Sequence, residues 1–440
     1  MGRNKRPAKI PASKTMPAAG TGTVKRPRAP IALAAVVIVI GVALRVINLA
    51  GVVSRSPDEA QYLYYASRIA DRGLSVTPKL FADYESNSGH WVYPCPSRFG
   101  HVLLFAAAMK LGGVRDASAG AAVSCLFTGL SLLLAAWIGL RFFNGWIALA
   151  GVTFLAFSVG ELGMAQRAWQ DATFSFLGLL LMYLACEIAR SPRRFLWYPA
   201  FFAVGAYSLL TKESGVLAYG LPAAWLLGVL LWKERYWKGA VLLVLGGLAS
   251  LAGCVLVWSL LAGGMATALS AVNHSFRSGG GAWAAKNCSG PWRQFFYMLW
   301  IVGPATAALA LAGAVFAALP RRLPHSAESA GPSVDQRAAA ALTFFTLGFF
   351  AFSAFVPNFQ YLRIIGPADG PYCLLAGLGL WRLLLLARGA MPEPDYRALI
   401  VLVVVGVAIA AGRDYSTFRT LSGSRMEDFA VCFIRDVMQR

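Results

Sequence analysis

Two adjacent carboxylates, Asp58 and Glu59, directly follow the first strongly apolar run of the chain. Acidic side chains are costly to hold beside lipid, so their position at the end of a membrane-length run favours a functional role. Ser56 suits the N-cap of a helix, Pro57 suits its first turn and Gly73 suits its end. This pattern predicts a short helix whose N-terminal dipole favours the ionised form of both acids. Simple capping of a helix on a membrane surface is the alternative interpretation.

The composition indicates a protein that crosses a membrane several times. The chain has 440 residues, of which 58% are hydrophobic and 14% are charged, and its mean hydropathy is +0.58. A soluble domain has about 25% charged residues. The net charge of +20 could suggest nucleic acid, but the positive residues gather in an N-terminal tail and in short loops between apolar runs. That distribution orients membrane proteins, so we expect membrane lipids as partners and no nucleic acid.

The chain divides into three parts. Residues 1–30 are basic and contain no acid, which predicts a disordered tail on the cytoplasmic side of the membrane. Residues 31–411 hold the apolar runs and form the predicted membrane domain. The first run, at about 31–49, is long enough to span and has no clear cleavage site, so we expect an uncleaved helix. Residues 412–440 then form a short tail outside the membrane.

The apolar runs predict an all-α bundle of about eleven membrane-spanning helices, judged against the ~20 residues that a span requires. The predicted spans are 31–49, 117–140, 146–165, 172–189, 196–210, 215–232, 239–262, 296–319, 338–356, 371–386 and 398–411. The run at 101–111 is too short to span, and we expect it to lie at the membrane interface. With the N-terminus inside, the arginine-rich and lysine-rich loops then fall on the cytoplasmic side.

This topology collects charged and polar groups on the outer face of the membrane. They are Asp58, Glu59, Arg98, Glu161, Arg167, Asp171, Lys212, Glu213, His274, Arg277, Lys286, Arg293, Tyr361, Arg363 and Asp369. Carboxylates mixed with arginine and lysine suit a site that binds an anionic substrate and accepts a proton. An ordinary solvated outer surface is the alternative interpretation.

Five motifs occur in the order typical of one family of membrane enzymes. They are Asp58-Glu59-Ala60-Gln61-Tyr62, Gln166-Arg167-Ala168-Trp169-Gln170-Asp171, Leu210-Thr211-Lys212, Asn273-His274-Ser275-Phe276-Arg277 and Tyr361-Leu362-Arg363-Ile364-Ile365-Gly366-Pro367. The sequence thereby resembles the GT-C fold glycosyltransferases that use polyprenyl-phosphate sugars. Bacterial lipid A aminoarabinose transferases and protein O-mannosyltransferases are the branches it resembles most.

The chain departs from this family pattern at two positions. Glu213 stands where the family has a glycine after Thr-Lys. Before the short run at 101–111, the family often has a lysine in Lys-Pro-Pro or Glu-Lys-Pro, and this chain has Pro94-Cys95-Pro96-Ser97-Arg98 instead. A lysine function at this point would therefore pass to Arg98.

The resemblance implies an inverting glycosyltransferase in the cytoplasmic membrane, with extracytoplasmic loops, an interfacial helix and an active site on the outer face. It would move a sugar from a polyprenyl-phosphate donor to a membrane-associated or envelope acceptor, namely a lipid, a glycan or a protein. The chemistry fits these residue types. A lipid phosphate is a good leaving group that needs cationic stabilisation, and the acceptor hydroxyl needs a base. Inversion requires a single base rather than a nucleophile and acid pair.

We assign roles on this basis. Asp58 is the expected base, Glu59 orients Asp58 or the acceptor, and Asp171 is a second carboxylate or a backup base. The candidates for binding the donor phosphate are Arg98, Lys212, Arg277, Arg363 and Tyr361, since arginine makes bidentate phosphate contacts and lysine supplies a point charge. No cofactor is required, although Asp58, Asp171 and His274 could coordinate Mg or Mn. A single histidine is more often a structural hydrogen-bonding residue.

Two other classes of function remain open. A secondary transporter or lipid flippase would carry charges near the membrane midplane on broken helices and would often show repeated halves. Here most charges fall at the ends of the predicted helices and no repeat is visible, which disfavours transport. A non-catalytic assembly or anchoring protein would have no need for carboxylates at Asp58 and Asp171.

The seven cysteines have no metal-like spacing. Cys125, Cys186, Cys254 and Cys373 fall in apolar runs and are expected to be small core residues. Cys95 and Cys288 fall in predicted external loops, where oxidation is permitted, so a disulfide between them is a further hypothesis. Cys432 is also predicted to be external, which leaves other pairings open.

Overall fold

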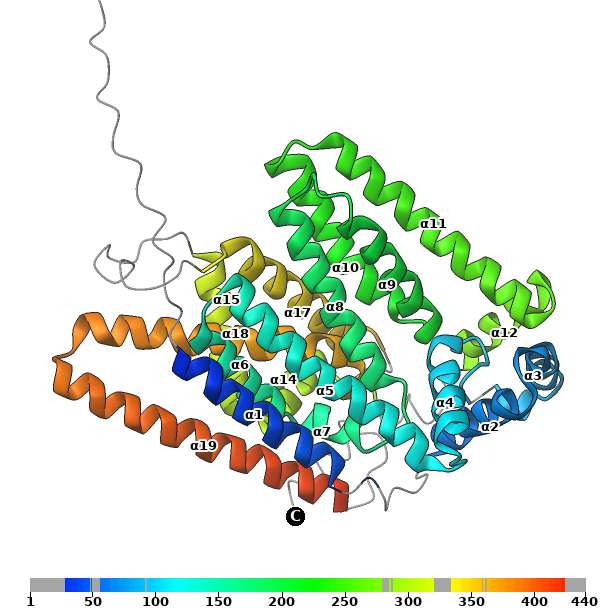
Figure 1. Cartoon of the computed structure of the whole chain (residues 1–440), viewed down its shortest axis with the longest axis horizontal. Coiled ribbons are helices and arrows are strands. Elements are labelled where there is room, and N and C mark those ends of the chain that lie inside the picture. Colours follow the sequence, from blue (N-terminus) through cyan, green and yellow to red (C-terminus); the bar gives the residue numbers. More distant parts are fainter. Residues whose placement is uncertain are drawn as a thin grey trace, which may run out of the picture.

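The computed structural model describes residues 28–47, 49, 56–91, 93–278, 285, 288–319, 334–357, 359–360 and 362–423, with side chains left out at 276–278. These residues form helices joined by short connections, and no strand occurs among them. Figure 1 shows a bundle with a smaller group of helices at one end. The all-α prediction is therefore confirmed.

Within the described residues, eight helices are long and apolar enough to cross a membrane. They are α1 (Arg28–Val46), α5 (Ala117–Phe142), α8 (Asp171–Arg190), α10 (Gly215–Gly228) with η4 (Val229–Lys233), α11 (Trp237–Ala262), α17 (Gln336–Phe355), η5 (Leu362–Ile365) with α18 (Gly366–Ala390), and α19 (Glu393–Gly423). Large apolar side chains face outward on several of them, including Val39, Leu256 and Ile409, as expected beside lipid. The chain is a multi-pass membrane protein.

The predicted number of eleven spans is not confirmed. Two of the predicted spans are pairs of helices with a sharp bend: α6 (Gly145–Ala156) meets α7 (Val159–Ala165) at 58°, and α14 (Trp292–Val302) meets α15 (Pro304–Ala318) at 114°. Counting each bent pair as one span gives up to ten in the part of the chain described. The remaining predicted span is α9 (Trp197–Thr211), which has only 15 residues and is short for a crossing.

The C-terminal boundary also differs from the prediction. The last span was expected to end at residue 411, whereas α19 continues to Gly423. Packing explains the extension, because Phe418 is 2% exposed and Leu421 is fully buried in the bundle. Residues 424–440 and the N-terminal residues 1–27 lie outside the described part of the chain.

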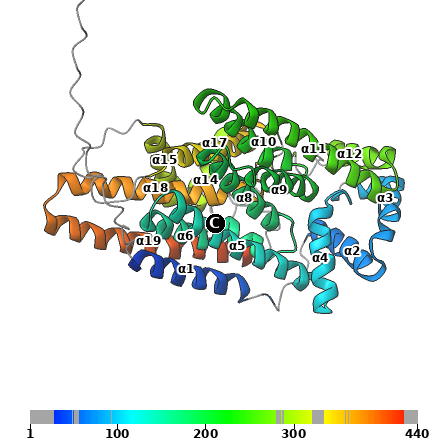
Figure 2. The same cartoon turned by 45° about the horizontal axis from the view of Figure 1, so that its top comes forward.

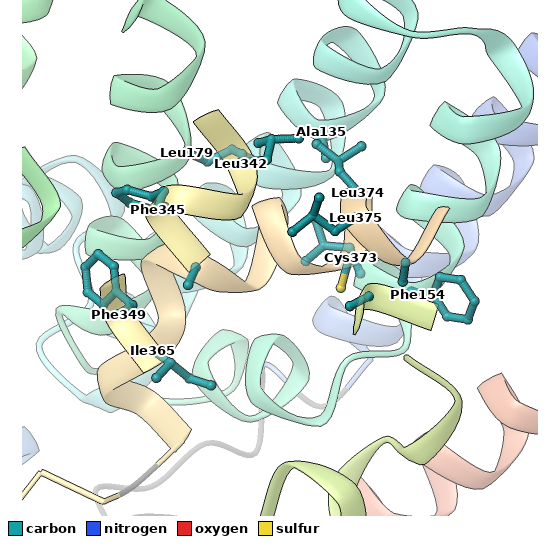
Figure 3. Packing of buried hydrophobic residues seen from close by; sticks show 14 of the residues in the cluster. Ala135, Phe154, Leu179, Leu342, Phe345, Phe349, Ile365, Cys373, Leu374 and Leu375 are labelled. Carbon is teal, nitrogen blue, oxygen red and sulfur yellow. The ribbon is translucent and has the colours of Figure 1, made fainter. Parts of the chain in front are cut away.

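Helix α18 lies at the centre of the bundle, where it packs against α6, α8, α15 and α17. Figure 3 shows Leu374 and Leu375 of α18 among buried side chains that include Leu179 and Phe345. Close packing of α15 on α18 depends on small residues, since a Cβ atom built at Gly379 would lie 2.0 Å from the carbonyl oxygen of Leu309.

A group of short helices lies at one end of the bundle, as Figures 1 and 2 both show. They are α2 (Pro57–Arg72), α3 (Thr77–Ser86), α4 (Phe99–Gly112) and α12 (Met265–Ser278). Helix α4 contains the run at 101–111 and has 14 residues, so it is the short apolar helix that the sequence predicts. It packs against α2, α5 and α9 and thereby joins this group to the bundle.

The predicted disulfide between Cys95 and Cys288 is wrong. Both side chains are fully buried, and no disulfide occurs among the described cysteines. Burial raises the pKa of the Cys95 thiol to about 12, which keeps it protonated and unreactive.

Candidate functional site

Helix α2 begins at the acidic pair. Ser56 is the N-cap, its hydroxyl accepts a hydrogen bond from the backbone N–H of Glu59, and the Glu59 carboxylate accepts one from the backbone N–H of Ser56 at 3.0 Å. Pro57 occupies the first turn. At the other end of the helix, the backbone N–H of Gly73 donates a hydrogen bond to the carbonyl oxygen of Ile69. The predicted short helix is confirmed, including the place of Asp58 and Glu59 in its first turn.

Glu59 is held in a buried ion pair. Its two carboxylate oxygens accept hydrogen bonds at 2.8 Å from Nε and Nη2 of Arg167, and one of them also accepts from the backbone N–H of Ala168 at 2.9 Å. Glu59 is fully buried and Arg167 is 5% exposed. Both oxygens are engaged, so the geometry makes Glu59 a residue that positions the start of α2 rather than one that meets an acceptor.

A buried tryptophan links the two acids of the pair. The guanidinium carbons of Arg167 and Arg363 lie 4.0 Å and 5.0 Å from the centre of the Trp169 ring system, within the range of cation–π attraction. The Trp169 indole N–H donates to the Ser56 hydroxyl at 3.2 Å. Arg167 binds Glu59 and Arg363 contacts Asp58, so the ring fixes the separation between the two arginines.

Asp58 is the more open acid of the two. Its Oδ2 atom accepts hydrogen bonds from Nη1 and Nη2 of Arg363 at 3.4 and 3.3 Å. The Asp58 side chain is 27% exposed and the Arg363 side chain is 12% exposed. The two contacts are long, and this combination leaves Asp58 accessible to another molecule while a cation lies beside it.

A second pair of opposite charges lies nearby. Lys212, which follows α9, places its ammonium 2.5 Å from Oδ1 of Asp171, the first residue of α8. Asp171 is fully buried, and its Oδ2 has no hydrogen-bond partner among the described residues. Burial lowers the pKa of Lys212, Asp171 opposes that shift, and the charge of Arg363 adds to it. Arg363 contacts Trp169, two residues before Asp171, and η5 (Leu362–Ile365), which holds Arg363, packs against α8, so the four residues belong to one site.

Arg98 also lies beside this site, but its charge is already matched. Its guanidinium forms hydrogen bonds to both carboxylate oxygens of Glu213 at 2.9 and 3.0 Å and to the Tyr62 hydroxyl at 2.5 Å. The pKa of Glu213 is lowered, because the attraction of Arg98 outweighs burial, which would raise it. The role of Arg98 in binding phosphate stays a prediction, since Lys212 is ion-paired in the same way. Both departures from the family motif, Arg98 and Glu213, form a single ion pair.

The other predicted site residues lie apart or outside the described region. His274 stacks on Trp91 with ring centres 3.7 Å apart, and its Nε2 atom is 3.7 Å from Oε2 of Glu85. The side chain of Arg277 and the whole of Tyr361 lie outside the described residues.

The three proposed metal ligands do not converge. Asp58 contacts Arg363, Asp171 contacts Lys212 and His274 stacks on an aromatic ring. Within the described ranges, no group of three or more histidines, cysteines, aspartates and glutamates is placed to hold a metal ion. The hypothesis of a Mg or Mn site from these residues is not supported by their positions.

Sequence reasoning missed His101 on α4. This side chain is fully buried, its ring centre is 5.4 Å from that of Tyr62, and neither ring nitrogen has a hydrogen-bond partner in the described part of the structure. Burial lowers its pKa to about 3, so the imidazole is neutral in the folded protein. His101 begins the apolar run at 101–111, and a single histidine at the start of such a run does not indicate a functional residue.

Because His101 is buried in its neutral form, we expect the folded protein to lose stability in acid. The folded pKa of about 3 lies below the unfolded value of 6.5, so the unfolded chain takes up a proton that the folded chain does not. Between pH 7 and pH 5 this lowers the free energy of unfolding by about 2 kcal/mol. We expect the melting temperature of His101→Asn to fall less than that of the wild type over this interval. An equal fall in both proteins would contradict the assignment.

Comparison with known proteins identifies the fold. No protein-family model matches the sequence, and a search among curated proteins also gives no match. Among solved structures, ArnT from Cupriavidus metallidurans matches with a TM-score of 0.51 and 18% identity over 93% of this chain and 76% of ArnT. The Archaeoglobus fulgidus oligosaccharyltransferase matches with a TM-score of 0.57 and 14% identity over 88% of this chain.

The two matches establish an architecture. The chain spans 56% of the length of the oligosaccharyltransferase structure, and the identities are low. The shared feature is therefore the fold of GT-C membrane transferases, as the resemblance of the motifs predicted. Fold alone does not determine an activity, which has to be argued from the site.

Proposed function

We propose that this protein is an inverting glycosyltransferase. It transfers a sugar from a polyprenyl-phosphate donor to a hydroxyl or phosphate acceptor on a lipid, glycan or protein. The observation that carries this proposal is the partly exposed carboxylate of Asp58 with the Arg363 guanidinium beside it, next to the buried pair of Lys212 and Asp171. An open carboxylate supplies a base, and the adjacent cations supply the charge that a leaving phosphate needs.

Each of the four residues has a distinct role in this scheme. Asp58 accepts the proton of the acceptor hydroxyl as the new bond forms at the anomeric carbon, on the face opposite the phosphate. Arg363 and Lys212 bind the phosphate and stabilise its negative charge as the old bond breaks. Asp171 holds the Lys212 ammonium in place through its contact at 2.5 Å. The attack inverts the anomeric centre in one step and needs no covalent enzyme intermediate.

The fold relatives support a lipid-phosphate donor. ArnT has been solved bound to undecaprenyl phosphate, and the A. fulgidus enzyme AglB has been solved with an inhibitory peptide and a dolichol-phosphate. Both ligands carry the group that Arg363 and Lys212 would bind in this chain. We place the site on the outer face of the cytoplasmic membrane and the N-terminus inside, because the basic loops then face the cytoplasm.

The bent spans bear on the alternative of a transporter or flippase, since broken helices around buried charges are typical of transporters. The cavity beside both bends has a volume of about 40 Å³, which is too small for a sugar or a lipid headgroup. This cavity gives a transport path no support, and the proposal of a transferase rests on the charged pairs at Asp58 and Lys212.

Replacing Arg363 tests donor binding. Arg363→Ala removes two hydrogen bonds from a charged group, so we expect the affinity for undecaprenyl phosphate in detergent to fall roughly 10- to 100-fold. Arg363→Lys keeps the charge but loses the planar fork, and an intermediate affinity is expected. Titration calorimetry with the purified protein measures both. Unchanged affinity in Arg363→Ala would remove the residue from the phosphate site.

A further inference from the structure

A second polar site lies inside the bundle, and Asp58 is not among the residues that line it. It is a cavity of about 40 Å³, with room for about three water molecules. Its polar lining comes from Ser158, Thr306, Asp369, Tyr372 and Asp414. Ordinary packing between membrane helices is apolar, so two carboxylates on one small buried cavity require an explanation.

Both sharp bends of the bundle occur at this cavity. Ser158 lies in the break between α6 and α7, and Gly303 lies in the break between α14 and α15. Irregular backbone at membrane depth is tolerated where it is buried in protein or lines a polar cavity. The C-terminal ends of α6 and α14 meet here, and the carbonyl groups of such ends favour a positive charge.

The carboxylate of Asp369 is poorly satisfied. Asp369 is 7% exposed and lines the cavity, and its Oδ2 accepts a 3.5 Å hydrogen bond from the Ser158 hydroxyl. The backbone approaches this atom closely, because a Cβ atom built at Gly160 would lie 2.8 Å from it. The fully buried carboxylate of Glu161 is the electrostatic neighbour of Asp369 and adds a second acid to this region. A buried carboxylate with one weak hydrogen bond and a second acid beside it must either take up a proton or gain a positive charge in the adjoining space.

Asp414 of α19 adds a second negative charge. It is 6% exposed, and a Cβ atom built at Gly303 would lie 3.5 Å from its Oδ2. Nη1 of Arg413 lies 3.5 Å from Oδ1 of Asp414 and partly compensates its negative charge. The Arg413 side chain is 41% exposed, however, and it also donates a hydrogen bond to the carbonyl oxygen of Ile301. The attraction of an exposed arginine is screened by solvent, so Arg413 compensates the charge of Asp414 only in part.

We propose that this cavity binds one hard divalent cation between Asp369 and Asp414, with Ca²⁺ favoured over Mg²⁺. Carboxylates, hydroxyls and carbonyl groups are the oxygen ligands that such ions prefer. The donors come from four separate elements, which suits the flexible coordination of Ca²⁺ better than the strict octahedron of Mg²⁺. The cavity leaves room for the ion to keep some of its water.

The position of the cavity gives the cation a structural function. Leu362 and Ile365 line it, and they lie on either side of Arg363 in η5. Figure 3 shows Ile365 and Cys373, two of the lining residues, among the buried side chains around α18. An ion here would tie η5, α18 and α19 together and hold Arg363 in place. This inference does not depend on the sugar or the acceptor in the proposed function.

Metal analysis and melting curves on the purified full-length protein test this proposal. After removal of metals with EDTA and dialysis against 1 mM Ca²⁺, we expect about one Ca²⁺ per chain by mass spectrometry. The melting temperature should rise by roughly 2–5 °C. Asp369→Asn should lose both effects, and Asp414→Asn provides an independent second variant. Both changes preserve volume and remove a buried charge, so the metal-free variants should be at least as stable as metal-free wild type.

Two control variants locate the ion. Asp395 is exposed on α19, the same helix as Asp414, and Asp395→Asn should bind Ca²⁺ as the wild type does. Asp58→Asn should also keep the ion, since Asp58 belongs to the other site. The proposal is overturned if the wild type binds no Ca²⁺, if Asp369→Asn keeps the ion, or if Asp58→Asn loses it.

Discussion

Asp58→Asn is expected to lower sugar transfer by roughly 10²- to 10⁴-fold, the usual cost of removing a general base. The amide has the same shape as the carboxylate and cannot accept the proton of the acceptor. Asp58 is partly exposed and its contacts with Arg363 are long, so the fold should survive the change. Binding of undecaprenyl phosphate should stay within a few-fold of wild type. Transfer assays with the purified protein measure the rate, and melting curves in detergent show whether the fold survives.

The matched control for this experiment is Asp171→Asn. That change breaks the buried contact with Lys212 and should lower both donor binding and stability, because it leaves the lysine without its partner. The two variants therefore differ in kind: one loses rate and the other also loses affinity. If folded Asp58→Asn transfers sugar within a few-fold of wild type, Asp58 is not the base, and Asp171 becomes the leading carboxylate.

Arg167→Ala should have the largest effect on stability. Breaking a buried ion pair costs about 3–5 kcal/mol, because the remaining charge is left without a partner. Here Glu59 would keep its capping contact with Ser56 but lose two hydrogen bonds of 2.8 Å. The stacking of Arg167 on Trp169 would be lost as well. We expect a large fall in melting temperature, together with a loss of transfer, since the start of α2 carries Asp58.

An exposed pair on another helix provides the control. Arg397 and Glu393 are four residues apart on α19 and are 77% and 59% exposed. Surface pairs of this kind contribute about 0–1 kcal/mol, so Arg397→Ala should leave the melting temperature almost unchanged. The double variant Arg167→Met with Glu59→Met should be more stable than Arg167→Ala, because no charge remains buried. Equal melting temperatures for Arg167→Ala and Arg397→Ala would show that the Glu59 pair is not a stabilising element.

Local features of the site could be predicted from the sequence. The N-cap at Ser56, the first-turn acids and the end at Gly73 follow from neighbouring residues, and they are present as expected. The approach of Lys212 to Asp171 and of Arg363 to Asp58 was expected only as a gathering of outer loops, and the structure supplies the pairs.

Pairings between distant segments could not be predicted in the same way. Glu59 and Arg167 are 108 positions apart, and the sequence around either residue gives no indication that the two form a pair. The ion pair between Arg98 and Glu213 could not be predicted, because it depends on how α4 meets the end of α9. His101 became visible only when the structure showed a buried imidazole without a partner.

The bends in the spans had partial signals. Pro304 begins α15 inside the predicted span 296–319, and the residue before a proline is biased away from helix, so a break at Gly303 could have been anticipated. Ser158 caps α7 within the predicted span 146–165, but a serine alone does not distinguish a break from a continuous helix. Hydrophobicity over a long window records both bent pairs as uninterrupted crossings.

The most direct test of the central claim is mass spectrometry of envelope lipids, glycans and proteins from a strain that lacks this gene. We predict that a sugar modification disappears, that a polyprenyl-phosphate sugar accumulates, and that wild-type protein restores both whereas Asp58→Asn, present at an equal level, restores neither. An envelope unchanged by the deletion, or full restoration by Asp58→Asn, would contradict the assignment of this protein as a transferase that uses Asp58 as its base.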